Sequence, residues 1–165
     1  MKTIFSEKLP RILKNKKRLE RELHLKISNK GRNVSIKGKP EEEYYGEKVI
    51  EALNFGFPFK EALSIKKENF VFERINLKEY TTRKDLSRIR ARIIGKKGKT
   101  LRVLRQLTKC FFEIKGNEVG IIGDPERIER AQEAIIALIR GSKHSNVYHF
   151  LEKHQIKPIY DLGLK

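Results

Sequence analysis

The sequence is poor in the residues that build disulfide scaffolds, metal centres and membrane spans. Its 165 residues include one cysteine, one methionine and no tryptophan. The single thiol, Cys110, can form no internal disulfide and no multi-cysteine zinc site. No apolar run approaches the roughly 20 residues that a spanning helix needs, and residues 1–6 lack the apolar core of a secretory signal. We therefore expect a soluble, cytoplasmic protein.

Acidic residues are also scarce. Asp and Glu number 21 against 38 Lys and Arg, which gives a formal net charge of +17. Because an excess of one sign costs the folded state self-repulsion, it predicts a polyanionic partner, with nucleic acid first and an anionic membrane second. The Lys- and Glu-rich surface of proteins from hot cells explains a high charge density but not this excess of one sign.

The positive charge lies in two blocks. Residues 8–32 hold ten basic side chains against two acidic ones, and residues 83–109 hold eleven against Asp85 alone. Acidic residues gather in 41–51 and 113–133. This alternation predicts that each half of the chain has a binding face and a solvent face.

The second half predicts the element order β-α-α-β-β-α. Asp85 and Asp124 are suitable helix caps, and a proline follows Asp124 at the first helical position. Gly116-Asn117 is a candidate two-residue hairpin turn. We expect a strand at 69–75, helices at 86–94 and 99–109, strands at 110–115 and 119–122, and a last helix from 125 that Gly141 can terminate.

The first half repeats this order in a shorter form. We expect a strand at 3–5, a helix at 16–23, strands at 25–28 and 34–37 around a Lys30-Gly31 turn, a helix at 41–53, and a turn with a short helix at 55–63. The fold class is therefore α+β, with two tandem units that each have a three-stranded sheet packed by helices. We place the domains at 1–67 and 68–165.

The most informative stretch is the loop Gly95-Lys96-Lys97-Gly98. Two glycines permit a tight turn with unusual backbone angles, and they let a phosphate backbone approach the main chain. The loop also opens a helix, whose N-terminus favours anions. The alternative is a plain connection between helices with solvated lysines. A nucleotide-hydrolase loop is excluded, because it needs Gly-x-x-x-x-Gly-Lys-Ser/Thr.

Residues around the loop complete the predicted site. Apolar side chains there can meet the bases of a single strand, and arginines can hold phosphates or stack. The predicted RNA-binding residues are Arg92, Ile93, Ile94, Gly95, Lys96, Lys97, Gly98, Lys99, Leu101, Arg102 and Arg105. We find no acid–base constellation with a supporting motif. We therefore expect no catalysis, no metal and no cofactor; a ribonuclease or nucleotide hydrolase is the remote alternative.

The stretch Ile93-Ile94-Gly95-Lys96-Lys97-Gly98-Lys99-Thr100 resembles the signature of type I KH domains. More narrowly, the chain resembles the archaeal tandem KH proteins related to the small-subunit ribosome biogenesis factor partner of Nob. Segments 56–63, 92–100, 119–124 and 144–152 carry this resemblance. It implies binding to single-stranded RNA near the 3′ end of the small-subunit rRNA during assembly and maturation. It also implies the endonuclease that trims that end, and the pre-ribosomal small subunit, as partners.

One departure concerns the first half, which has no glycine before Gly31. A Gly-x-x-Gly loop is therefore impossible there, and the segment 10–17 reads as a shortened version; degenerate first units are typical of the family that the chain resembles. This unit can touch RNA through Lys14, Lys16, Lys17 and Arg18 or can dock a protein. An adaptor that mainly recruits the endonuclease is the alternative function. For the adjacent Phe111 and Phe112, one side chain should be core and the other should face the groove or the second helix.

Overall fold

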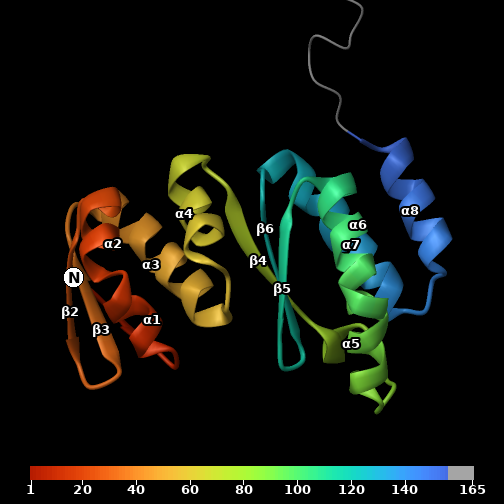
Figure 1. Cartoon of the computed structure of the whole chain (residues 1–165), viewed down its shortest axis with the longest axis horizontal. Helices are drawn as coiled ribbons and strands as arrows, with labels where there is room; N and C mark the ends of the chain where they lie inside the picture. Colours follow the sequence, from red (N-terminus) through yellow and green to blue (C-terminus); the bar gives the residue numbers. More distant parts are fainter. Residues whose placement is uncertain (156–165) are drawn as a thin grey trace, which may run out of the picture. The chain divides into compact units, whose positions relative to one another are not determined.

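The computed structural model describes residues 1–155, which form parts of two compact units, Met1–Glu73 and Arg74–Lys165. Each unit has one three-stranded antiparallel sheet packed by helices (Figure 1). The predicted α+β class with two tandem KH-like units is confirmed. The predicted domain limits, 1–67 and 68–165, stay a prediction.

The first unit has the sheet order β1-β3-β2. Lys30 pairs with Asn33 across the β2–β3 hairpin, so the turn residues are Gly31 and Arg32, one position later than predicted. Gly31 has a φ of 60°, which glycine adopts without strain. The elements are β1 (Lys2–Phe5), α1 (Leu9–Lys14), α2 (Lys16–Leu23), β2 (Lys26–Lys30), β3 (Asn33–Lys37), α3 (Pro40–Phe55) and α4 (Phe59–Lys67).

Helix α1 was not predicted, because the sequence in this region reads as a shortened loop. Its stability comes from distant parts of the unit. Ile12 has no exposed surface, and the Arg11 guanidinium donates to the carbonyls of Leu53 and Phe57 at 3.3 and 2.8 Å. The short helix thus docks on the end of α3, and the basic segment that follows begins α2 directly after Asn15.

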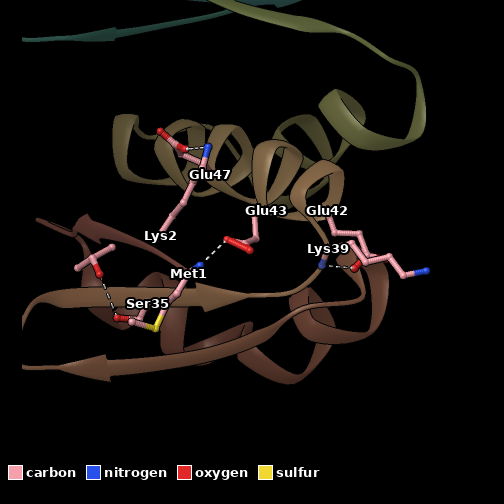
Figure 2. A network of polar contacts seen from close by, with 8 residues as sticks. Met1, Lys2, Ser35, Lys39, Glu42, Glu43 and Glu47 are labelled. Carbon is pink, nitrogen blue, oxygen red and sulfur yellow. Dashed lines mark hydrogen bonds and ion pairs between the residues drawn. The ribbon is translucent and has the colours of Figure 1, made fainter.

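Polar contacts join β1 to the start of α3 (Figure 2). The amino group of Met1 lies 2.9 Å from the carboxylate of Glu43, and Lys2 Nζ lies 2.7 Å from that of Glu47. Hydrogen bonding from the Met1 amino group lowers the pKa of Glu43, and hydrogen bonding to Glu47 raises the pKa of Lys2. Both shifts show that these charged forms are favoured by the partners facing them.

The second unit has the sheet order β4-β6-β5, so β5 is an edge strand. The limit between the two compact units falls inside β4. The elements are β4 (Val71–Asn76), α5 (Leu86–Ile94), α6 (Lys99–Thr108), β5 (Phe111–Lys115), β6 (Glu118–Gly123), α7 (Pro125–Ile139) and α8 (His144–Lys153), with 3-10 turns at Leu77–Glu79 and Lys96–Gly98.

Local signals in this unit were predicted correctly. The Asp85 carboxylate accepts the backbone N–H of Arg88, and the Asp124 carboxylate accepts that of Glu126. Both aspartates therefore cap the helices expected to follow them. Lys115 pairs with Glu118, which leaves Gly116 and Asn117 as the two-residue turn. The apolar positions of α7 that recur at helical spacing are buried: Ile128, Ala131, Ile135, Leu138 and Ile139.

The core of the second unit settles the choice between the two phenylalanines. Phe112 has no exposed surface and pairs with buried Ile121 on β6, whereas Phe111 is half-buried. Helices α6 and α7 pack against this sheet. Among the helices of residues 1–155, none has the length and apolarity of a membrane span.

Candidate nucleic-acid interface

The loop between α5 and α6 has the unusual backbone that its sequence predicts. Gly95 (φ 77°, ψ 171°), Lys97 (φ 55°, ψ 31°) and Gly98 (φ 75°, ψ 13°) all have positive φ. The Gly98 N–H donates to the Gly95 carbonyl at 3.1 Å, and α6 begins at the next residue, Lys99. The loop is thus a tight turn that leads directly into a helix N-terminus.

The two glycines of this loop are favoured for different reasons. A Cβ on Gly95 would lie 2.1 Å from Thr100 Oγ1 and 2.6 Å from Thr100 N, so no side chain fits there. A Cβ on Gly98 would meet only Arg102 Nη1, at 3.7 Å, so this position favours glycine for its backbone angles alone. Thr100 is buried and packs on Gly95. It was not in the predicted set, although its place directly after Gly-x-x-Gly-Lys is the signal that could have included it.

The surface of the loop is strongly positive. Lys96, Lys97, Lys99 and Arg102 are exposed and close in sequence. The Arg102 guanidinium donates to the Lys97 carbonyl at 2.7 Å, which braces the turn from the first part of α6. In the described chain, residues 1–155, the ion pairs do not include the three lysines. Together with the positive end of the α6 dipole, they form a positively charged surface of the kind that favours anions.

The predicted apolar residues divide into exposed and buried positions. Ile94 is 37% exposed and Leu101 is half-buried, so both present apolar surface beside the loop. Ile93 has no exposed surface. Its side chain anchors the end of α5 in the core, and the loop is held in place by that packing.

Two of the predicted arginines have structural partners. Arg92 donates to the backbone carbonyls of Leu138 and Ser142 at the end of α7. Arg105 donates to the Phe112 carbonyl on the edge strand β5 at 3.0 Å and remains exposed. Arg92 thus ties α5 to α7, and Arg105 ties α6 to the sheet. Arg102 is the arginine that contacts the loop itself.

Residues 1–155 contain no group of three or more His, Cys, Asp or Glu side chains placed to hold a metal ion. Cys110 is buried beside Gly123, and a Cβ on Gly123 would lie 2.4 Å from the Cys110 Sγ. Burial raises the pKa of the Cys110 thiol to about 11. Two hydrogen bonds lower the pKa of Asp85: the larger effect comes from the Ser87 hydroxyl and the smaller from the Arg88 N–H. Both groups therefore serve the fold, one in packing and one as a cap.

The sequence matches a family model for the second KH domain of PNO1, described as a eukaryotic-type KH domain (KH domain type I), over residues 71–156. A KH domain-containing protein of Methanocaldococcus jannaschii is 31% identical over 149 residues, which cover 86% of this chain and 66% of that protein. The pre-rRNA-processing protein pno1 of Aspergillus fumigatus is 32% identical over 112 residues, covering 66% of this chain and 44% of that protein. The chain thus spans less than two thirds of each relative.

Solved structures give the same result for the fold over nearly the whole chain. Dim2p from Pyrococcus horikoshii superposes with a TM-score of 0.85 at 28% identity, covering 93% of this chain and 98% of Dim2p. A complex of a/eIF2alpha, aDim2p and rRNA from the same organism contains a chain that matches with a TM-score of 0.82 at 29% identity, covering 92% of each chain.

Proposed function

The chain belongs to the PNO1 family of type I KH-domain proteins, and on this basis we propose that it binds single-stranded RNA through its Gly95–Gly98 loop, as a non-catalytic factor in ribosome biogenesis. One observation carries this proposal. At Gly95 and Gly98 the loop bears no side chains, and it bears two exposed lysines between them at the start of α6. A sugar–phosphate backbone can approach such a surface closely and meet positive charge there.

The residues in and beside the loop have different roles in binding. Lys96 and Lys97 neutralise phosphates, while Lys99 and Arg102 extend the positive surface along α6. Bases of the strand turn toward the apolar surface that Ile94 offers. KH loops of this type clamp about four nucleotides, and apolar contacts favour unstacked bases over a duplex.

We further propose that the RNA is the 3′ region of the small-subunit rRNA and that the trimming endonuclease is a partner. The rRNA in the Pyrococcus complex and the pre-rRNA-processing role of the Aspergillus relative support an rRNA ligand. The resemblance to partner of Nob supports the endonuclease. The first unit, which lacks a glycine before Gly31, is the candidate for docking that protein. Co-purification of the two proteins after RNase treatment would support a direct contact, and its absence would contradict one.

Fluorescence anisotropy across a salt series tests the RNA proposal. The probe is a single strand that copies the 3′ end of the small-subunit rRNA, with a scrambled strand and a duplex as controls. A clamp on about four nucleotides predicts a log–log salt slope of about −3. A much steeper slope with equal affinity for all three RNAs would mean that the protein, with its net charge of +17, binds polyanions non-specifically.

The double variant Lys96→Asp with Lys97→Asp tests the loop directly. We expect RNA binding to be abolished while circular dichroism and melting stay unchanged, because both side chains are exposed and aspartate tolerates the left-handed backbone of residue 97. Retained affinity would contradict the assignment of this loop.

A matched pair of single variants separates position from charge. Lys97 and Lys109 are both exposed and left-handed, with φ of 55° and 57°, and they lie at opposite ends of α6. Asparagine fits this conformation at either place. We expect Lys97→Asn to weaken RNA binding about tenfold, the value of a hydrogen bond to a charged group, and Lys109→Asn to leave it nearly unchanged. Equal losses would show that only total charge matters.

A further inference from the structure

A second basic surface lies in the same unit, away from the Gly95–Gly98 loop. It is a shallow hollow of about 430 Å³ between the segment 78–83, which precedes α5, and the end of α7. The lining residues are Lys78, Glu79, Tyr80, Thr81, Thr82, Arg83, Ile139 and Arg140. We call it the Tyr80 hollow. None of these residues is in the predicted RNA-binding set.

The charge of the Tyr80 hollow is positive. Lys78, Arg83 and Arg140 are exposed, and Glu79 is the acid among the lining residues. Within residues 1–155 the ion pairs do not involve any of these four side chains. Three cations against one carboxylate leave a surplus that suits an anion.

The geometry adds an aromatic platform to this charge. The Arg140 guanidinium lies 5.6 Å from the centroid of the Tyr80 ring. Arg83 Nη2 lies 3.8 Å from the place that a Cβ on Gly141 would take, so Arg83 reaches toward the same end of α7. The segment from Tyr80 to Arg83 contains a turn in which the Arg83 N–H donates to Thr81 Oγ1 at 3.1 Å. Two guanidinium groups and one ring therefore face a common hollow.

A purely structural role for the two arginines is to satisfy the carbonyl end of α7. That role already belongs to Arg92, which donates to the carbonyls of Leu138 and Ser142. Backbone N–H groups also serve this end, since Ser142 donates to the Ala137 carbonyl at 2.9 Å. Arg83 and Arg140 are therefore not needed to complete the helix.

We propose that the Tyr80 hollow is a second RNA contact, in which Arg83 and Arg140 hold a phosphate and the Tyr80 ring supports a neighbouring base. Aromatic rings and guanidinium planes are the surfaces on which unpaired bases stack. Hydroxyls of Thr81 and Thr82 and the ammonium of Lys78 supply further donors at the rim. The inference rests on the proposed function, because it extends the path of the same RNA strand.

The test compares two RNA lengths and two pairs of substitutions. A strand of about four nucleotides fills only the loop site, whereas one of roughly three times that length extends beyond it, as a contact with the hollow would require. Arg83→Gln with Arg140→Gln removes two charges from the hollow. Arg130→Gln with Lys153→Gln removes two charges from α7 and α8 and serves as the control; the Arg130–Glu133 ion pair that it breaks is exposed and worth little.

We expect the hollow variant to weaken binding of the long strand roughly tenfold and to reduce its salt slope by about 1.4, or 0.7 for each lost contact. Binding of the short strand, and of both strands to the control, should stay unchanged. Unchanged affinity and slope for the long strand would overturn the inference. Loss of affinity for the short strand as well would also overturn it, because the effect would then not be local to the hollow.

A second measurement stands even if the hollow variant is unstable. Long RNA carrying photoreactive 4-thiouridine is cross-linked to the unaltered protein, and the attached peptides are identified by mass spectrometry. Cross-links to 78–83 are expected, and their absence beside cross-links at 94–99 would refute the second contact. If Lys96→Asp with Lys97→Asp leaves binding of both strands intact, the proposed function fails instead, so the two failures are distinguishable.

Discussion

The two glycines of the Gly95–Gly98 loop should differ sharply when each is replaced by alanine. At Gly98 the new methyl group meets only Arg102 Nη1 at 3.7 Å, so the cost is that of a left-handed alanine, about 1 kcal/mol. At Gly95 the backbone lies in a region that is essentially restricted to glycine, at φ 77° and ψ 171°, which costs about 1–3 kcal/mol. The methyl group would also overlap Thr100, with contacts of 2.1 Å to Oγ1 and 2.6 Å to N.

Overpacking of a site that cannot relax adds about 1–3 kcal/mol, so we expect Gly95→Ala to destabilise the protein by about 3 kcal/mol or more. Urea denaturation followed by circular dichroism measures both variants. With a slope of about 1–3 kcal/mol per molar urea, the Gly95→Ala midpoint should fall by one molar or more, and the Gly98→Ala midpoint by less than half as much.

A double variant sharpens the reasoning about Gly95. Thr100→Ala removes only the contact to Oγ1, while Thr100 N and Cβ, at 2.6 and 2.7 Å, remain in place. We therefore expect Thr100→Ala to recover little of the stability lost in Gly95→Ala. Equal midpoints for the two glycine variants, or full recovery in the double variant, would refute the assignment of the cost to backbone overlap.

Two further predictions concern the fold of the second unit. Burial raises the pKa of the Cys110 thiol to about 11 from its ordinary 9.0, so the unfolded chain loses the thiol proton at lower pH than the folded chain. The free energy of unfolding should therefore fall as pH rises from 9 to 11. A Cys110→Ala variant that keeps the same pH dependence would contradict this. Asp124→Ala removes the acceptor for the Glu126 N–H and should cost about 1 kcal/mol in urea denaturation, whereas Asp124→Asn should cost much less; equal losses would exclude a capping role.

Much of the local structure could be predicted because its signals act over a few residues. A cap needs an acceptor two or three positions before its N–H partner, as at Asp85, and a hairpin turn needs two suitable residues between strands, as at Gly116-Asn117. Helix α2 occupies the expected residues 16–23, because its apolar positions repeat at the helical period. The backbone of the Gly95–Gly98 loop is also a local property, since the two glycines permit the positive φ angles that the turn uses.

Side-chain partners far apart in the chain could not be predicted in this way. The RNA-binding role of Arg92 stays a prediction, but the sequence did not indicate that its guanidinium donates to the carbonyls of Leu138 and Ser142, which are 46 and 50 residues away. Helix α1 docks through Arg11, which donates to carbonyls 42 and 46 residues away. In the first unit the observed turn lies one residue after the predicted one. Strand register depends on which side chains the sheet buries, and the turn residues alone do not specify it.

What the sequence by itself determined is therefore the class of fold, the family and the backbone of the Gly95–Gly98 loop, because periodicity, caps and glycine spacing are properties of short segments. Tertiary structure alone decided that Ile93 is buried while Ile94 is exposed, and that Phe112, not Phe111, lies in the core. It also brought Tyr80 and Arg140, which are far apart in the chain, to one hollow. These outcomes depend on how helices and strands distant in the sequence pack together, and no local pattern contains that information.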